Sequence, residues 1–143
     1  MVVVDSAVWI DFFKGQLTPA TMHLSQMLGN EPILVGDLIL CEVLQGARND
    51  RQSRDFELTM RKCEFVEMAG CDVAVAAAAK YRQLRAAGIT VRKTIDMLIG
   101  TYCILNRHTL LHSDRDYDPM AQHLGLKVVP THYMVNEPMV AYG

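Results

Sequence analysis

Short runs of aliphatic and β-branched residues recur along the chain, separated by longer segments in which apolar and polar positions alternate with a helical period. Continuous apolar runs of a few residues are typical of strands that are buried on both faces of a sheet. The pattern predicts strands at residues 2–4, 33–35, 109–112 and 127–129.

The intervening segments carry helix signals. Thr18-Pro19 is typical of a helix start, and Gly88 is typical of a helix end. The segment at residues 50–62 is amphipathic, and Phe56, Leu58 and Met60 supply its apolar positions. Helices are predicted at residues 6–14, 19–29, 38–45, 50–62, 72–88, 94–107 and from 119. Short strands separated by helices predict an α/β fold, with a short parallel central sheet flanked by helices on both faces.

Length and composition limit the class of protein. The chain has 143 residues, of which 50% are hydrophobic and 21% charged, as expected of a single globular domain spanning residues 1–143. The longest nearly uncharged stretch, residues 97–106, is shorter than the roughly 18 apolar residues that cross a membrane. The first residues, MVVVD, contain no basic leader. We therefore expect a cytoplasmic protein without a membrane segment.

Cysteine usage and net charge exclude two further classes. Cys41, Cys63, Cys71 and Cys103 show no C-x-x-C spacing, which favours buried thiols over disulfides or a zinc site. The formal net charge of −2 argues against nucleic-acid binding through bulk charge. A local basic patch remains compatible with it.

The segment LLHSDRDYDPM places several aspartates directly after a predicted strand. Asp114 and Asp116 follow that strand, and Asp5 ends the first one. In open parallel sheets the carboxyl ends of strands meet at one edge, where ligands bind. We therefore expect these three carboxylates to converge.

Two more acids stand in predicted helices. Glu42 lies within the apolar segment LILCEVL, where an ionised carboxylate needs compensation, and Asp96 lies in the first turn of TIDMLIG. Each acid alone has a structural explanation, such as a helix cap, a charge on a helix dipole or an aspartate-rich turn. Together, the acids would raise one another's pKa unless a divalent cation held them ionised. Hard oxygen ligands favour Mg²⁺ or Mn²⁺.

Four motifs in this order resemble a known family. MVVVDSAVWIDFFKG, LILCEVLQGAR, TIDMLIG and LLHSDRDYD together resemble the PIN-domain ribonucleases, and specifically the VapC-type toxins of VapBC toxin–antitoxin modules. The resemblance extends over residues 1–129. It leaves the tail at residues 130–143 without an assigned role.

The resemblance implies a metal-dependent endoribonuclease. Its catalytic acids would be Asp5, Glu42, Asp96 and Asp114, and the ligands of Mg²⁺ or Mn²⁺ would be Asp5, Asp96, Asp114 and Asp116. Hydrolysis would leave 5′-phosphate and 3′-hydroxyl ends. The family's commonest target is transfer RNA, its usual assembly is a homodimer, and its inhibitor is a VapB-type antitoxin.

Basic residues near these acids are candidates for RNA contacts. Lys80, Arg82 and Arg85 lie on one predicted helix, and Arg92 and Lys93 immediately precede the helix with Asp96. All five could bind phosphates. A solvated helix face explains the first three equally well.

Two other readings remain open. An aspartyl-phosphate enzyme would also place acids at strand ends, but the first strand lacks D-x-D and no lysine directly follows a later strand. The second alternative is a catalytically inactive PIN-fold module that binds RNA or protein.

His112 could act as a base, although a histidine at a strand end is more often structural.

Overall fold

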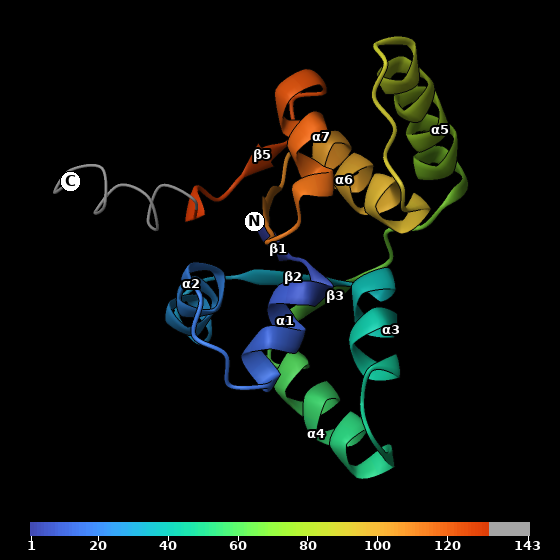
Figure 1. The fold of residues 1–143 in the computed structure, drawn as a ribbon. Helices are drawn as coiled ribbons and strands as arrows, with labels where there is room; N and C mark the ends of the chain where they lie inside the picture. The colour runs from blue at the N-terminus through green and yellow to red at the C-terminus, as the bar shows by residue number, and fades with distance from the viewer. Residues whose placement is uncertain (132–143) are drawn as a thin grey trace, which may run out of the picture.

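The computed structural model describes residues 1–131 (Figure 1). Within them, five parallel strands form one sheet in the order β3-β2-β1-β4-β5. The strands are β1 (Val2–Val4), β2 (Ile33–Gly36), β3 (Glu64–Val66), β4 (Thr109–Leu111) and β5 (Lys127–Val128). Of the tail at residues 130–143, to which the sequence assigned no role, residues 132–143 lie outside the described part.

Seven α-helices and one short 3₁₀ helix connect the described strands. They are α1 (Ser6–Phe13), α2 (Pro19–Met27), α3 (Asp37–Gln45), α4 (Asp50–Met60), α5 (Cys71–Ala86), α6 (Thr94–Asn106), the 3₁₀ helix η1 (Arg115–Tyr117) and α7 (Asp118–His123). Thr18 caps α2, as its sequence predicts, and Gly88 adopts the left-handed conformation just beyond α5.

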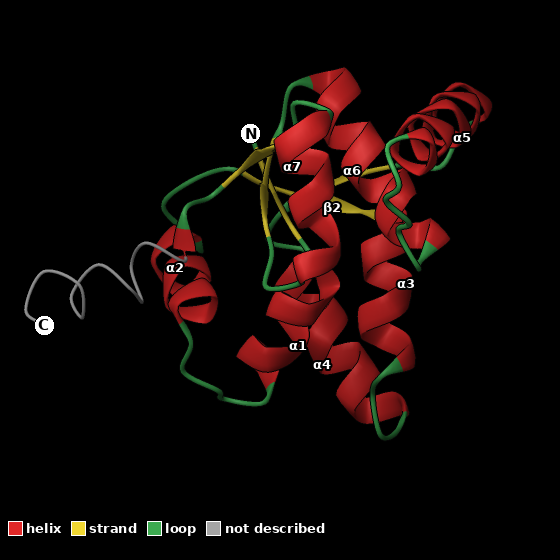
Figure 2. Cartoon of the chain, turned by 45° about the horizontal axis from the view of Figure 1, so that its top comes forward, coloured by secondary structure: helices red, strands yellow, loops and turns green. Residues whose placement is uncertain are grey.

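The helices cover both faces of the sheet, which confirms the predicted fold class. Figures 1 and 2 show α1 to α4 on one face and α5 to α7 on the other. The chain runs from β1 outward through β2 to β3, and then returns to β4 on the opposite side of β1. Because connections between parallel strands are right-handed, this change of direction moves the later helices to the opposite face. The switch therefore lies between β1 and β4.

The buried core surrounds the central strands. Val3, Leu34 and Leu110 are buried on three neighbouring strands and lie in register across the sheet. On α1, Trp9 is fully buried and its ring stacks on Phe13, with ring centroids 5.8 Å apart. Phe12 and Phe13 are partly buried and pack against the same core.

Strand β3 was not predicted from the sequence. It is three residues long, begins with the exposed Glu64 and, among the described strands, pairs only with β2 at the edge of the sheet. An edge strand of this length lacks the continuous apolar run that marks buried strands. Its signal is therefore weak in the sequence.

Two predictions about burial were wrong. Leu58 is 67% exposed, because it lies two residues from Phe56 and from the buried Met60, on the opposite side of α4. Cys41 and Cys71 are exposed rather than buried. Both stand at positions where a helix faces solvent, and burial of a thiol follows from helix packing, which residue type alone does not reveal. Cys103 is fully buried, as predicted.

Among the described residues, no helix is both long and apolar enough to cross a membrane.

Candidate active site

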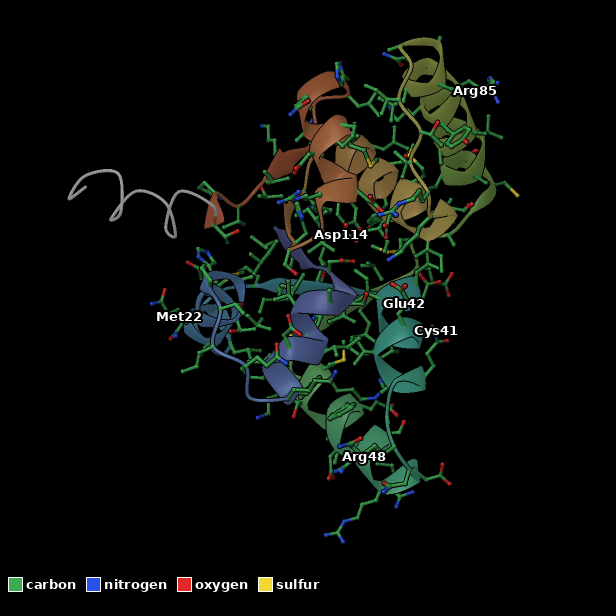
Figure 3. All side chains as sticks on the ribbon, in the orientation of Figure 1. Met22, Cys41, Glu42, Arg48, Arg85 and Asp114 are labelled. Atoms are coloured by element: carbon green, nitrogen blue, oxygen red, sulfur yellow. The ribbon has the colours of Figure 1, made fainter. Side chains whose placement is uncertain are left out.

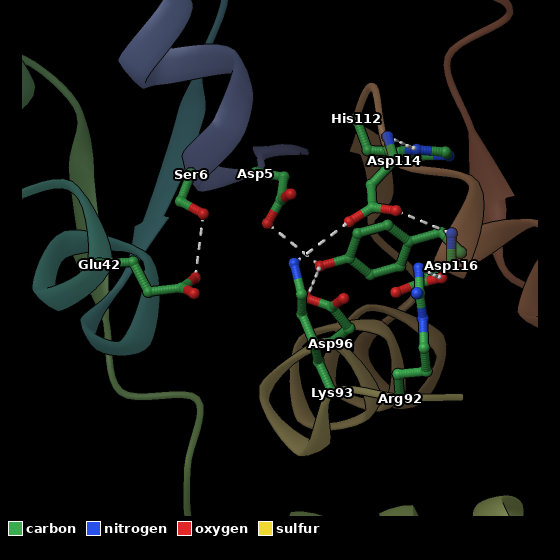
Figure 4. A network of polar contacts seen from close by, with 10 residues as sticks. Asp5, Ser6, Glu42, Arg92, Lys93, Asp96, His112, Asp114 and Asp116 are labelled. Atoms are coloured by element: carbon green, nitrogen blue, oxygen red, sulfur yellow. Dashed lines mark hydrogen bonds and ion pairs between the residues drawn. The ribbon is translucent and has the colours of Figure 1, made fainter. Parts of the chain in front are cut away.

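The acidic residues meet where the sheet changes direction. Asp5 follows β1 and is the N-cap of α1, and Asp114 follows β4, the neighbour of β1. Asp96 reaches the same place from the first turn of α6. Figure 4 shows these side chains turned toward one another. The predicted convergence at the carboxyl edge of the sheet thus occurs at the switch point, where α/β sheets place their ligand sites.

Three of the acids form a cluster suited to a cation. Asp96, Asp114 and Asp116 each offer a carboxylate oxygen, and these oxygens lie within 4.8 Å of one another. Asp96 is only 4% exposed, and its Oδ2, like Oδ2 of Asp116, is buried without a hydrogen-bond partner in the described structure. Buried carboxylate oxygens normally have a partner. Hard, unpaired oxygens in this arrangement fit Mg²⁺ or Mn²⁺.

Asp5, the fourth predicted metal ligand, lies beside this cluster. It is 3% exposed, and its Oδ1 accepts a hydrogen bond of 3.1 Å from the hydroxyl of Tyr117. The same hydroxyl lies 3.3 Å from Oδ1 of Asp96. Tyr117 therefore joins Asp5 to the cluster.

Sequence reasoning missed Tyr117. Its ring is fully buried, and η1 turns it inward immediately after Asp116. The only signal available was an aromatic residue in the middle of an acidic segment, DRDYD. Such a residue would ordinarily be assigned to the core.

Glu42 approaches from α3. It is half-buried, and Ser6 Oγ donates a hydrogen bond of 3.0 Å to its Oε1. Its charge contributes to raising the pKa of Asp5, as expected of a neighbouring carboxylate. The compensation that the sequence required for Glu42 comes in part from this hydroxyl.

Burial and mutual repulsion raise the pKa values of Asp5 and Asp96. Burial, followed by the charge of Asp96, raises the pKa of Asp5 from 3.8 to about 7. Burial, followed by the charge of Asp114, raises the pKa of Asp96 from 3.8 to about 6. The Tyr117 hydrogen bonds oppose both shifts, and nearby Lys93 opposes the shift of Asp96. Without a cation, these two carboxyl groups therefore keep their protons to a higher pH than a free aspartate does.

Two of the five predicted RNA-binding cations lie at the site. Lys93 Nζ is 3.8 Å from Asp114 Oδ2, and Arg92 is 3.5 Å from Asp116 Oδ1. Both cations remain largely exposed to solvent.

The other three, Lys80, Arg82 and Arg85, stand on α5. Figure 3 shows Arg85 toward the far end of that helix, away from Asp114, and its guanidinium lies over the ring of Tyr81. The structure thus brings Arg92 and Lys93 to the acids, and it leaves Arg85 apart from them.

His112 has a structural contact with the same loop. It is buried, and its Nδ1 accepts a hydrogen bond of 3.1 Å from the backbone amide of Asp114. Its ring also packs against Tyr117, with centroids 4.9 Å apart. These contacts hold in position the acidic loop that follows β4.

The sequence model of the PIN domain matches residues 2–123. The chain belongs to the PIN-domain family. It is similar to Ribonuclease VapC11 of Mycobacterium tuberculosis, with 28% identity over 129 residues that cover 89% of this chain and 96% of the relative. A VapC ribonuclease of Mycobacterium bovis matches with the same identity and coverage. The resemblance to VapC-type ribonucleases is confirmed.

Solved structures agree with this fold. VapBC2 from Rickettsia felis, bound to a DNA fragment from its promoter, matches with a TM-score of 0.72 and 13% identity, covering 90% of this chain and 98% of that one. A toxin–antitoxin complex from Klebsiella pneumoniae matches with a TM-score of 0.66 and 20% identity, covering 92% and 98%. At these identities the likeness shows a common fold.

Proposed function

We propose that this PIN-domain protein is an endoribonuclease that depends on Mg²⁺ or Mn²⁺, and that it is the toxin of a VapBC-type module acting in the cytoplasm. One observation carries the proposal: three carboxylates converge within 4.8 Å at the carboxyl edge of the sheet. The buried, unpaired oxygens of Asp96 and Asp116 support a cation ligand there. The similar proteins named VapC ribonucleases support RNA as the substrate.

In this proposal four acids share the task of binding the cation. Asp96, Asp114 and Asp116 hold the cation, with Asp5 as the fourth ligand. When bound, the cation supplies positive charge to the phosphate and lowers the pKa of an attacking water.

The remaining site residues act on the water and the substrate. Glu42, oriented by Ser6, binds and orients the water on the α3 side of the site. Arg92 and Lys93 hold the RNA phosphates beside the acids. Hydrolysis then leaves a 5′-phosphate.

An inactive binding module is the alternative. It would not need a buried carboxylate oxygen without a partner, because such a group costs about 1–3 kcal/mol or more when nothing binds it. The complete set of acids therefore favours a working site.

The test is cleavage of RNA by the wild type and by Asp96→Asn. We expect a loss of roughly 100-fold or more in activity, because the variant removes a charge that balances the cation. Asp55→Asn, an exposed change on α4, is the matched control and should retain activity. EDTA should abolish cleavage by the wild type.

Full activity in EDTA, or an unaffected Asp96→Asn variant, would contradict the proposal. Profiling of 5′-phosphate ends in cells that express the protein would identify the RNA, with transfer RNA as the expected target.

We further propose a VapB-type antitoxin as the partner. The structural neighbours include toxin–antitoxin complexes, which supports such a partner. A guanidinium is permanently charged and pairs bidentately with carboxylates, so an antitoxin arginine inserted among the site acids would replace the cation's charge.

Binding of an antitoxin peptide should therefore weaken at least about 10-fold in an Asp96→Asn/Asp114→Asn variant, as expected when buried charge pairs are lost. Calorimetry with and without Mg²⁺ measures this effect. Equal affinity in all cases would place inhibition elsewhere on the molecule.

A further inference from the structure

Tyr117 lies at the centre of the acidic site without belonging to the acid set. Its ring is fully buried, and its hydroxyl lies 3.1 Å from Asp5 Oδ1 and 3.3 Å from Asp96 Oδ1. Figure 4 shows Asp5, Asp96 and Asp114 turned toward this point. Ring packing alone would be served by phenylalanine. The hydroxyl therefore adds a function that packing does not need, and a buried hydroxyl must have partners.

The hydroxyl is held in place by the ring. The ring packs against His112, and the same histidine accepts a hydrogen bond from the backbone of Asp114. One short segment after β4 thus carries both an acid of the cluster and the group that contacts the two acids on other elements. Movement of Tyr117 is restricted on every side by burial.

The contacts of the Tyr117 hydroxyl determine which carboxylate oxygens of Asp5 and Asp96 remain available to a cation. Oδ1 of Asp5 and Oδ1 of Asp96 both lie within hydrogen-bond distance of the Tyr117 hydroxyl, whose single proton is donated to one of them at a time, whereas Oδ2 of Asp96 is buried and has no hydrogen-bond partner in the described structure. A carboxylate with one oxygen tied to a fixed donor has its other oxygen directed as well. A donor between two acids also offsets their repulsion.

We propose that Tyr117 is a positioning residue for the cation site. Its hydroxyl holds Asp5 and Asp96 in the orientation that presents their remaining oxygens to a divalent cation shared with Asp114 and Asp116. Tyr117 acts through these carboxylates and does not contact the RNA. The inference rests on the proposed function, since it assigns a role at the same site.

The experiment compares Mn²⁺ binding to the wild type and to Tyr117→Phe by titration calorimetry, without RNA. Loss of a hydrogen bond to a metal ligand weakens metal affinity by about 10- to 100-fold, so we expect the Kd of Tyr117→Phe to rise at least about 10-fold. Cleavage by the variant should need correspondingly more Mn²⁺, while its KM for RNA at saturating Mn²⁺ stays that of the wild type.

Tyr102→Phe is the matched control. It removes a hydroxyl from a mostly buried tyrosine on α6 whose ring stacks on His108. Its Kd for Mn²⁺ should equal that of the wild type. Thermal unfolding without metal shows whether each variant is folded, and Tyr117→Met removes the same hydroxyl if Tyr117→Phe does not fold.

Equal Kd values for the wild type and the folded Tyr117 variant would overturn the inference and leave the proposed function intact. Tighter binding by the variant would also overturn it, because the hydroxyl would then compete with the cation. A wild type that binds no Mn²⁺ would overturn the proposed metal dependence, and the inference with it.

Discussion

At the scale of single residues, the site is a set of carboxylates kept in an unfavourable environment. The pKa of Asp5 is raised to about 7 and that of Asp96 to about 6, in each case chiefly by burial. A raised pKa means that the folded protein binds protons more tightly than the unfolded chain. A cation that binds here must displace those protons, so its affinity should increase with pH.

The same shifts predict how the stability of the metal-free protein depends on pH. Protonated Asp5 is compatible with burial, so its contribution is fully present below about pH 4 and is lost as the pH rises to about 7. We expect the free energy of unfolding of Asp5→Asn at pH 8 to exceed that of the wild type by on the order of 4 kcal/mol, with the difference vanishing near pH 4. Urea unfolding in EDTA measures it. A difference that stayed constant from pH 4 to 8 would refute this account.

At the scale of elements, the start of α6 supplies two charged side chains to the acidic site. Asp96 lies in the first turn of α6, where the helix dipole favours a negative charge, and Lys93 is the N-cap residue of the same helix. A single helix start therefore presents an acid and a cation to the site. The basic residues of α5 lie on a neighbouring helix, and Arg85 points elsewhere (Figure 3).

This arrangement predicts unequal contributions to RNA binding. In EDTA, Lys93→Ala should weaken binding of a single-stranded RNA and reduce the salt dependence of log K by about 0.7, because one phosphate contact is lost. Arg85→Ala is the control on α5 and should leave both quantities unchanged. Fluorescence anisotropy at several salt concentrations measures them. A larger effect of Arg85→Ala than of Lys93→Ala would contradict this prediction and would indicate that the RNA binds along α5.

At the scale of the whole molecule, α5 has an exposed face that the described residues 1–131 do not cover. Val75 is 73% exposed, and its helical neighbours Ala74, Ala78 and Ala79 are exposed too. Figures 1 and 2 show α5 at the outside of the fold. Half of the residues are hydrophobic, which supports burial of part of this surface between two copies. We propose a symmetric homodimer that uses this face.

Light scattering tests the dimer. The wild type should be a dimer at micromolar concentration, and Val75→Glu should be a monomer, because a charge buried between two copies of α5 costs several kcal/mol. Leu58→Glu, a change at an equally exposed apolar position on α4, should leave the dimer intact. A monomeric wild type would contradict the proposal, as would a dimeric Val75→Glu protein.

Most of the architecture follows from the sequence. The apolar runs that become β1, β2, β4 and β5 are local signals, and right-handed connections then allow few arrangements of the parallel strands. Asp5, Asp114 and Asp116 were identifiable because they follow two of these strands, at an edge of the sheet where ligands bind. Asp96 was identified from the first turn of a predicted helix and from the family resemblance. Strand β3 was not identifiable, since its pairing with β2 depends on an edge that only the folded sheet provides.

The tertiary structure alone decided how the acids are held and which groups accompany them. Tyr117 is 112 residues from Asp5 in the chain, and no local pattern reveals that its hydroxyl meets that carboxylate. The nearness of Lys93 to Asp114, the exposure of Leu58 and Cys41, and the raised pKa of Asp5 likewise depend on packing between distant segments. Periodicity and residue type act over a few positions, whereas burial and electrostatic coupling arise only when separate elements come together.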